Sequence, residues 1–167
     1  MFRIYCLCVL YCFTMSVAMG CFAFNTTRFS GYAAGTTCLT YPNKTNQFEA
    51  AIKFGFAVHF IGIFCDAGMA VQVKNQANKL LAKAAPAAVG IYTLTWLVWL
   101  IYTIAVRYNA TGKECSLEGA ALTKQHYLTQ QGQVLQNFVI GTLCANVGIV
   151  VYAVVDSILT NKKKQNI

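Results

Sequence analysis

One acidic residue, Asp66, lies inside a 20-residue apolar stretch that runs from Phe54 to Val73 and contains no Lys, Arg or Pro. A helix of this length spans about 30 Å, the thickness of the hydrocarbon core of a bilayer. Insertion of a carboxyl group into the middle of a membrane costs about 2.5 kcal/mol or more in free energy. Such a group usually faces a bundle interior or a water-filled cavity. Asp66 is therefore a candidate proton or cation site. The alternative interpretation is an acid that fixes helix packing through hydrogen bonds.

The state of this acid depends on what surrounds it. Its carboxyl could stay ionised beside a basic or hydrogen-bonding partner, or become protonated through desolvation. Apolar segments at matching depth offer five partners: Tyr11, Cys12, Thr14, Thr93 and Thr95. Nearby, Tyr92, Trp96 and Trp99 are spaced i, i+4 and i+7, so they line one helical face. That face could serve helix packing or the stacking of a ligand.

Two further polar side chains fall within apolar segments. His59 precedes Asp66 by seven residues, which places it on the same helical face but about 10 Å away, too far for direct contact. It is the one histidine in such a segment, since His126 lies in a polar stretch, so two-histidine haem ligation within one chain is disfavoured. Asn146 lies in the middle of the last apolar segment, where we expect a hydrogen bond between helices.

Motifs of known catalytic chemistry are missing from the sequence. It has no GxSxG, no HExxH, no phosphate-binding loop and no CxxC, and its five acids offer few candidates for acid–base work. No cluster of His, Cys, Asp and Glu has the spacing of a metal site. We therefore expect no catalytic residue, no metal and no cofactor, and we expect the protein not to be an enzyme.

The overall composition is that of an integral membrane protein. Hydrophobic residues make up 57% of the 167 residues, and charged residues 11%, against about 25% in soluble domains. We predict an all-α tetraspan bundle, residues 1–167 forming a single four-helix membrane domain with both termini on the same, cytosolic side. The predicted spans are about 4–24, 51–73, 86–107 and 134–159, with outer loops 25–47 and 108–133 and an inner loop 74–85.

The beginnings of these spans carry local signals. The first resembles a signal peptide, but its apolar run of about 21 residues exceeds the 7–15 of a signal core, so we expect it to stay as a span. Glu49 and Lys53 are spaced i,i+4 and are expected to pair before the second span. Pro86 suits the first turn of the third.

The two predicted outer loops contain features of the secretory pathway. All three glycosylation sequons fall there, at Asn25, Asn43 and Asn109. Each loop also contains one cysteine well away from the spans, Cys38 and Cys115, and in an oxidising compartment these two could form a disulfide, with Cys21 as a competing partner. Used sequons would place both loops on the lumenal or extracellular side.

The formal net charge is +8, and the basic residues gather near the ends of apolar segments. This placement favours lipid headgroups over nucleic acid as the partner. Seven bases fall on the predicted inner side: Arg3, Lys74, Lys79, Lys83, Lys162, Lys163 and Lys164. Because they lie in short segments beside span ends, they favour cytosolic termini.

The layout resembles that of tetraspan membrane proteins in general, although the second outer loop lacks the Cys-Cys-Gly of tetraspanins. We expect a non-catalytic membrane glycoprotein that is an accessory subunit of a larger assembly, in the plasma membrane or a secretory-pathway membrane. Its partners would be the lipid bilayer and other integral membrane proteins or copies of itself. One alternative is an oligomeric pore or proton-conducting protein with Asp66 on the path. Another is an accessory subunit of an energy-converting complex in an organelle inner membrane.

Overall fold

A computed structural model of the chain describes residues 1–24, 44–74, 79–116 and 129–165. Within these ranges the protein is helical and contains no strand, which confirms the all-α prediction. The helices are α1 (Phe2–Ala23), α3 (Lys44–Lys74), α4 (Lys79–Tyr108), α5 (Ala110–Cys115) and α6 (Thr129–Gln165).

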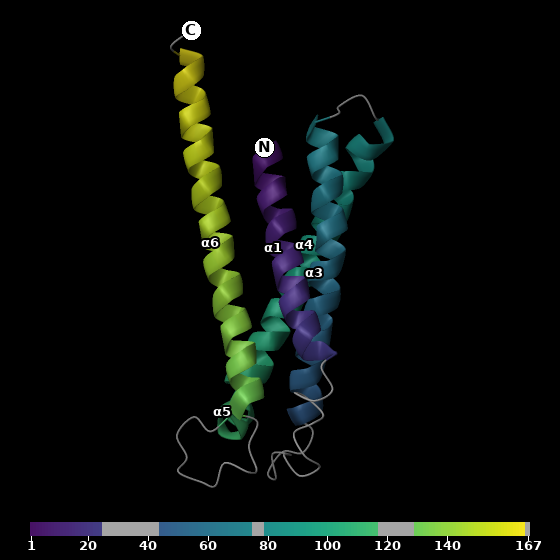
Figure 1. The fold of residues 1–167 in the computed structure, drawn as a ribbon, viewed down its shortest axis with the longest axis vertical. Helices are drawn as coiled ribbons and strands as arrows, with labels where there is room; N and C mark the ends of the chain where they lie inside the picture. The colour runs from purple at the N-terminus through teal and green to yellow at the C-terminus, as the bar shows by residue number, and fades with distance from the viewer. Residues whose placement is uncertain (25–43, 75–78, 117–128, 166–167) are drawn as a thin grey trace.

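Four of these helices are long and apolar enough to cross a membrane. Their apolar parts are Phe2–Ala23, Gln47–Lys74, Ala82–Tyr108 and Gly132–Leu159. Successive long helices run in opposite directions, so α1 begins and α6 ends at the same end of the bundle, here called the termini end (Figure 1). The opposite end, where α5 lies, is called the α5 end. Which side of a membrane each end faces stays a prediction.

Helices α1, α3 and α4 pack closely around Gly55 of α3. A Cβ atom on Gly55 would lie only 2.6 Å from the Met19 sulfur of α1 and 2.6 Å from Trp99 Nε1 of α4. The Trp99 indole is fully buried and donates a hydrogen bond of 2.8 Å to the Ala51 carbonyl oxygen. The absence of a side chain at Gly55 therefore lets three helices meet at one level.

At the α5 end, Arg107 connects the end of α4 to the start of α6. Its side chain is buried, with Nε donating to the Gly132 carbonyl oxygen at 2.7 Å and Nη2 to Gln136 Oε1 at 3.1 Å. Its guanidinium also lies over the Tyr108 ring, 5.2 Å from the ring centroid. A buried cation is tolerated here because polar oxygens and an aromatic face surround it.

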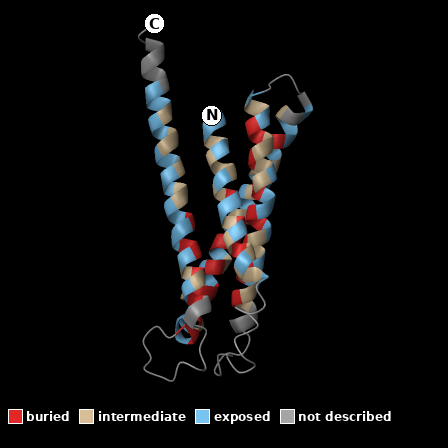
Figure 2. Ribbon diagram, viewed as in Figure 1, coloured by how far each residue is buried: buried red, intermediate tan, exposed pale blue. Residues whose placement is uncertain are grey.

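Helix α6 packs on the other helices only near the α5 end. Its buried residues are Gly132, Leu135, Phe138, Val139 and Thr142. From residue 143 to residue 159 no side chain is buried, although the apolar span continues to Leu159. Figure 2 shows this part of α6 without buried residues, and in Figure 1 the helix diverges from α1 toward the termini end. Most of the apolar surface of α6 therefore lacks a protein neighbour within the described chain.

Three local features can be compared with the sequence-based expectations. The Glu49–Lys53 ion pair is present as predicted. Pro86 is not in the first turn of its helix, because α4 begins at Lys79 and contains Pro86 in its interior. The preceding KLLAKAA segment is rich in strong helix formers, which explains the earlier start. The short helix α5 forms inside a stretch that we expected to be a loop, and α6 extends past its predicted span at both ends.

Candidate functional site

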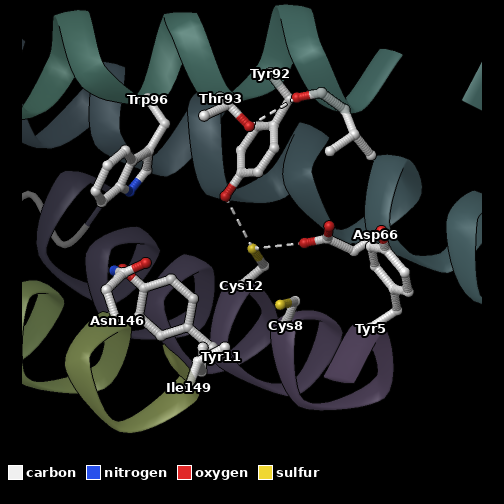
Figure 3. Close-up of a pocket in the computed structure, with 11 residues that line it drawn as sticks. Tyr5, Cys8, Tyr11, Cys12, Asp66, Tyr92, Thr93, Trp96, Asn146 and Ile149 are labelled. Atoms are coloured by element: carbon white, nitrogen blue, oxygen red, sulfur yellow. Dashed lines mark hydrogen bonds between the residues drawn. The ribbon is translucent and has the colours of Figure 1, made fainter. Parts of the chain in front are cut away.

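A cavity of about 220 Å³ lies between α1, α3, α4 and α6, at the level of Asp66 (Figure 3). Its walls combine four aromatic rings, two thiols, one carboxyl and one amide. The lining residues are Tyr5, Cys8, Tyr11, Cys12, Asp66, Val89, Tyr92, Thr93, Trp96, Asn146 and Ile149. The cavity is thus a polar and aromatic site within the apolar part of the bundle.

Helical periodicity brings these side chains to one place. On α1, Tyr5, Cys8 and Cys12 are spaced i, i+3 and i+7, so they share one face. On α4, Val89, Tyr92, Thr93 and Trp96 are spaced i, i+3, i+4 and i+7 and form a second stripe. Asp66 comes from α3 and Asn146 from α6. The spacing on α1 and α4 is therefore sufficient to present both stripes to the same space.

Asp66 is linked to α4 through a cysteine of α1. The Cys12 thiol donates to Asp66 Oδ2 at 3.6 Å and lies 3.1 Å from the Tyr92 hydroxyl oxygen (Figure 3). Asp66 is 5% exposed and Cys12 is 1% exposed. Because the thiol proton is directed to the carboxyl, the Tyr92 hydroxyl can donate to the sulfur, which gives a hydrogen-bonded series from α4 to α3.

Gly62 of α3 makes this contact possible. A Cβ atom on Gly62 would lie 2.7 Å from the Tyr92 ring and 2.9 Å from the Cys12 sulfur. By contrast, a Cβ atom on Gly68 of the same helix would meet nothing within 4 Å. Gly62 is therefore required for the close approach of α1 and α4 to α3, whereas Gly68 is not.

Of the five suggested partners of Asp66, the structure selects Cys12. The hydroxyls of Thr14, Thr93 and Thr95 donate instead to carbonyl oxygens one turn earlier in their own helices, at 2.8–2.9 Å. The role of Tyr92 was not predicted from the sequence. Its helical phase relative to Trp96 was the available signal, but that pattern alone could not show that the ring would reach Cys12.

His59 lies in a neighbouring buried cluster that shares Tyr11 with the cavity. Its Nδ1 lies 2.8 Å from the Gly55 carbonyl oxygen, and its Nε2 lies 3.2 Å from the Tyr11 hydroxyl. A carbonyl oxygen can only accept, so Nδ1 carries the proton and Nε2 accepts from Tyr11. The imidazole also meets the Trp99 ring edge to face, with centroids 4.9 Å apart. His59 therefore joins α1, α3 and α4 and is not directed toward Asp66.

Asn146 reaches the cavity from α6, but its amide bonds within its own helix. Its Nδ2 donates to the Thr142 carbonyl oxygen at 2.8 Å, where we expected a bond between helices. The Thr142 hydroxyl is buried and has no hydrogen-bond partner among the described residues. The side chains of Thr142 and Asn146 both lie close to the Tyr11 hydroxyl of α1, and Asn146 also lines the cavity.

The predicted loop sites are only partly described. Asn25, Asn43 and Cys38 lie outside the described residues. Asn109 is exposed and forms the N-cap of α5, its Oδ1 accepting from the Gly112 amide at 2.7 Å and from the Thr111 hydroxyl at 3.0 Å. Cys115 is buried, and it is not among the free thiols of the described residues, which are Cys6, Cys8, Cys12, Cys21, Cys65 and Cys144. Glycosylation of Asn109 and the Cys38–Cys115 bond stay predictions.

Together, the fold and the cavity define a class: an all-helical chain with four helices able to span a membrane and an acidic, aromatic cavity among them. In the described part of the chain, no group of three or more His, Cys, Asp and Glu side chains is placed to hold a metal ion. Comparison with protein-family models, with curated proteins and with solved structures found no match for this chain.

Proposed function

We propose that this protein is a non-catalytic tetraspan subunit that packs beside a larger integral membrane protein through α6. The observation that supports this role is the incomplete packing of α6. Its apolar span runs to Leu159, yet burial against the other described helices stops at Thr142. A partner helix would cover the apolar surface that the chain itself leaves open.

A groove beside α6 indicates what kind of partner would fit. It has a volume of about 390 Å³ and lies between α1 and α6. Its lining residues are Leu7, Leu10, Tyr11, Thr14, Ala145, Gly148 and Ile149. A Cβ atom on Gly148 would meet nothing within 4 Å, so at this position α6 leaves open space in the groove. Large apolar side chains of a membrane-spanning helix would fit against such small residues.

Substitution of Gly148 by leucine tests this proposal. The Cβ atom of a Gly148→Leu side chain would meet nothing within 4 Å, so the leucine can occupy the groove, where it should displace the partner helix and preserve the fold. We expect the tagged protein, purified in mild detergent from the cells that make it, to form a stoichiometric complex with one integral membrane protein. The Gly148→Leu variant should retain a tenth or less of this partner, which corresponds to a weakening of binding on the order of tenfold. Native mass spectrometry gives the composition of the wild-type complex and of the Gly148→Leu sample.

Gly90→Leu is the matched control. Gly90 of α4 is also exposed with nothing within 4 Å of its Cβ position, but it is not in the groove. This variant should keep the partner. Equal losses for both variants, or a wild-type protein recovered only as a monomer, would contradict the proposal. A complex of identical chains that Gly148→Leu dissolves would replace the foreign partner by self-association.

A second candidate function is the conduction of protons or cations by an oligomer, with Asp66 on the path. It is favoured by the position of the Asp66 carboxyl in a hollow with other polar groups. This function predicts a flux in liposomes that Asp66→Asn reduces by roughly an order of magnitude or more, since the membrane site would lose its charge. A flux that is the same with and without the protein would exclude it.

The proposed setting is the plasma membrane or a secretory-pathway membrane, with the termini in the cytosol, Asn109 glycosylated and Cys115 bonded to Cys38. The exposed position of Asn109 supports this setting. An organelle inner membrane is the alternative, and there Asn109 would stay unmodified. The two settings differ in the mass of the purified chain before and after glycosidase treatment.

A further inference from the structure

We propose that the cavity around Asp66 binds a small organic ammonium ion that also carries an oxygen acceptor, of the choline or ethanolamine type. This inference goes beyond the proposed subunit role and does not depend on it. It rests on the charge, the aromatic walls, the Trp96 indole and the size of the cavity.

The charge of the cavity favours a cation. Asp66 is the one carboxyl in the lining, and the lining residues include no Lys or Arg. The nearest base along α3, Lys74, is placed elsewhere, with its Nζ 5.9 Å from the centroid of the Phe2 ring. An intramembrane carboxylate is costly without a counterion. A bound monovalent cation would supply the charge that the described residues do not.

The walls of the cavity are largely aromatic. Four aromatic side chains line the cavity: Tyr5 and Tyr92 on the side of the carboxyl, and Tyr11 and Trp96 on the side of Asn146 (Figure 3). Aromatic faces attract organic ammonium ions, and rings around a carboxylate are a general way to recognise a methylated nitrogen. Hard metal ions instead require several oxygen ligands, and this lining offers only one carboxyl. The chemistry of the walls therefore favours an organic cation over Ca²⁺ or Mg²⁺.

The Trp96 indole also lines the cavity. Its N–H is buried and forms no hydrogen bond of good geometry among the described residues, although the Tyr11 hydroxyl lies within its reach. Figure 3 shows this nitrogen on the side of the ring that faces Asn146, across the cavity from Asp66. Buried donors in native proteins are generally satisfied. An oxygen at the far end of the ligand would satisfy this one, while the ammonium group lies near Asp66.

The size of the cavity agrees with such a ligand. A volume of about 220 Å³ is ample for a small organic cation such as choline and too small for a large ligand. The ligand could be a free solute or the headgroup of a lipid, because Tyr11 and Ile149 line both this cavity and the groove between α1 and α6.

Binding of radiolabelled choline to the full chain in nanodiscs tests the proposal. The nanodiscs contain only phosphatidylglycerol, so that no lipid supplies an ammonium group. We expect saturable binding at micromolar to millimolar choline, weaker competition by tetramethylammonium than by unlabelled choline, and no competition by equimolar potassium. Asp66→Asn should weaken choline binding at least tenfold, because the carboxylate is the counterion. Asp156→Asn, which removes an acid of α6 outside the cavity, should leave it unchanged.

A second pair of variants keeps the test valid if Asp66→Asn does not fold. Gly62→Ala would push the Tyr92 ring or the Cys12 sulfur from its place and should weaken choline binding, whereas Gly68→Ala should not. Trp96→Phe keeps an aromatic wall but removes the N–H, so it should abolish the preference for choline over tetramethylammonium.

The outcomes separate the sources of the ligand. Reduced choline binding in phosphatidylcholine nanodiscs would show that the lipid headgroup occupies the site, and unchanged binding would identify a free solute. Three results would overturn the proposal: no saturable binding at millimolar choline, equal binding by wild type, Asp66→Asn and Gly62→Ala, or equal displacement by potassium. Absence of a partner complex would not affect these results, so the failure of the subunit role is distinguishable from the failure of this inference.

Discussion

Gly112→Ala is expected to lower the free energy of unfolding by about 2–3 kcal/mol, as overpacking against a rigid neighbour does. Gly112 is buried in α5, and a Cβ atom there would collide with the backbone carbonyl oxygen of Val106 and would lie 2.7 Å from that of Arg107. These oxygens belong to the last turns of α4 and cannot rotate away as a side chain could. The new methyl group must therefore move α5 away from α4.

The loss should extend to the start of α6. Ser116 donates from Oγ to the Gly112 carbonyl oxygen at 2.7 Å, and its side chain lies directly against Gly132 of α6. Displacement of α5 would therefore disturb this contact as well. Unfolding in mixed micelles, followed by circular dichroism, gives the difference in free energy. Gly68→Ala is the control, since its Cβ meets nothing and alanine is the better helix former by up to about 1 kcal/mol. Equal stability of the two variants would contradict the described packing of α5.

Arg107→Met is expected to cost about 2–4 kcal/mol in the free energy of unfolding. Methionine keeps the length of the side chain but loses both hydrogen bonds to α6, and a bond from a charged donor contributes about 1.5–3 kcal/mol. The contact of the guanidinium with the Tyr108 ring is lost too. Because α6 is attached to the bundle mainly near this end, we expect its first turns to become the earliest part to exchange amide hydrogens.

Two comparisons make this second prediction specific. Arg107→Lys keeps the charge but not the planar fork, so it should recover only part of the loss. Lys53→Met removes the Glu49–Lys53 pair, in which Lys53 is 51% and Glu49 37% exposed, and should cost less than about 1 kcal/mol. If Arg107→Met were no more destabilising than Lys53→Met, Arg107 would not join α4 to α6 in the way described.

The four long helices could be predicted from the sequence because each apolar segment is long enough to cross a bilayer, and length is what hydropathy measures well. Their ends were harder to place. Pro86 was expected in a first turn, yet the α4 helix starts at Lys79 and continues through it, since a helix with good formers on both sides tolerates the loss of one hydrogen bond. The short α5 was missed, although Asn109 is a favourable N-cap.

The candidate site was predictable only in part. An acid in an apolar segment singles out Asp66 without any structure, and depth matching included Cys12 among its partners. The contribution of Tyr92 depends on the close approach at Gly62, a three-helix contact that no pattern within one segment specifies. The divergence of α6 from the other helices could not be predicted from the sequence either. Its span is apolar on all sides, so the sequence gives no face along which it must pack.

The proposed interface of α6 with another membrane protein is best tested by photocrosslinking in the native membrane. A photoreactive amino acid is placed at Val151 of α6, which is 56% exposed, and in a second protein at Ile101 of α4, which is 65% exposed. If α6 forms this interface, position 151 gives an adduct with one integral membrane protein and position 101 gives none with that protein. Adducts with lipid alone at position 151, or the same protein adducts from both positions, would contradict it.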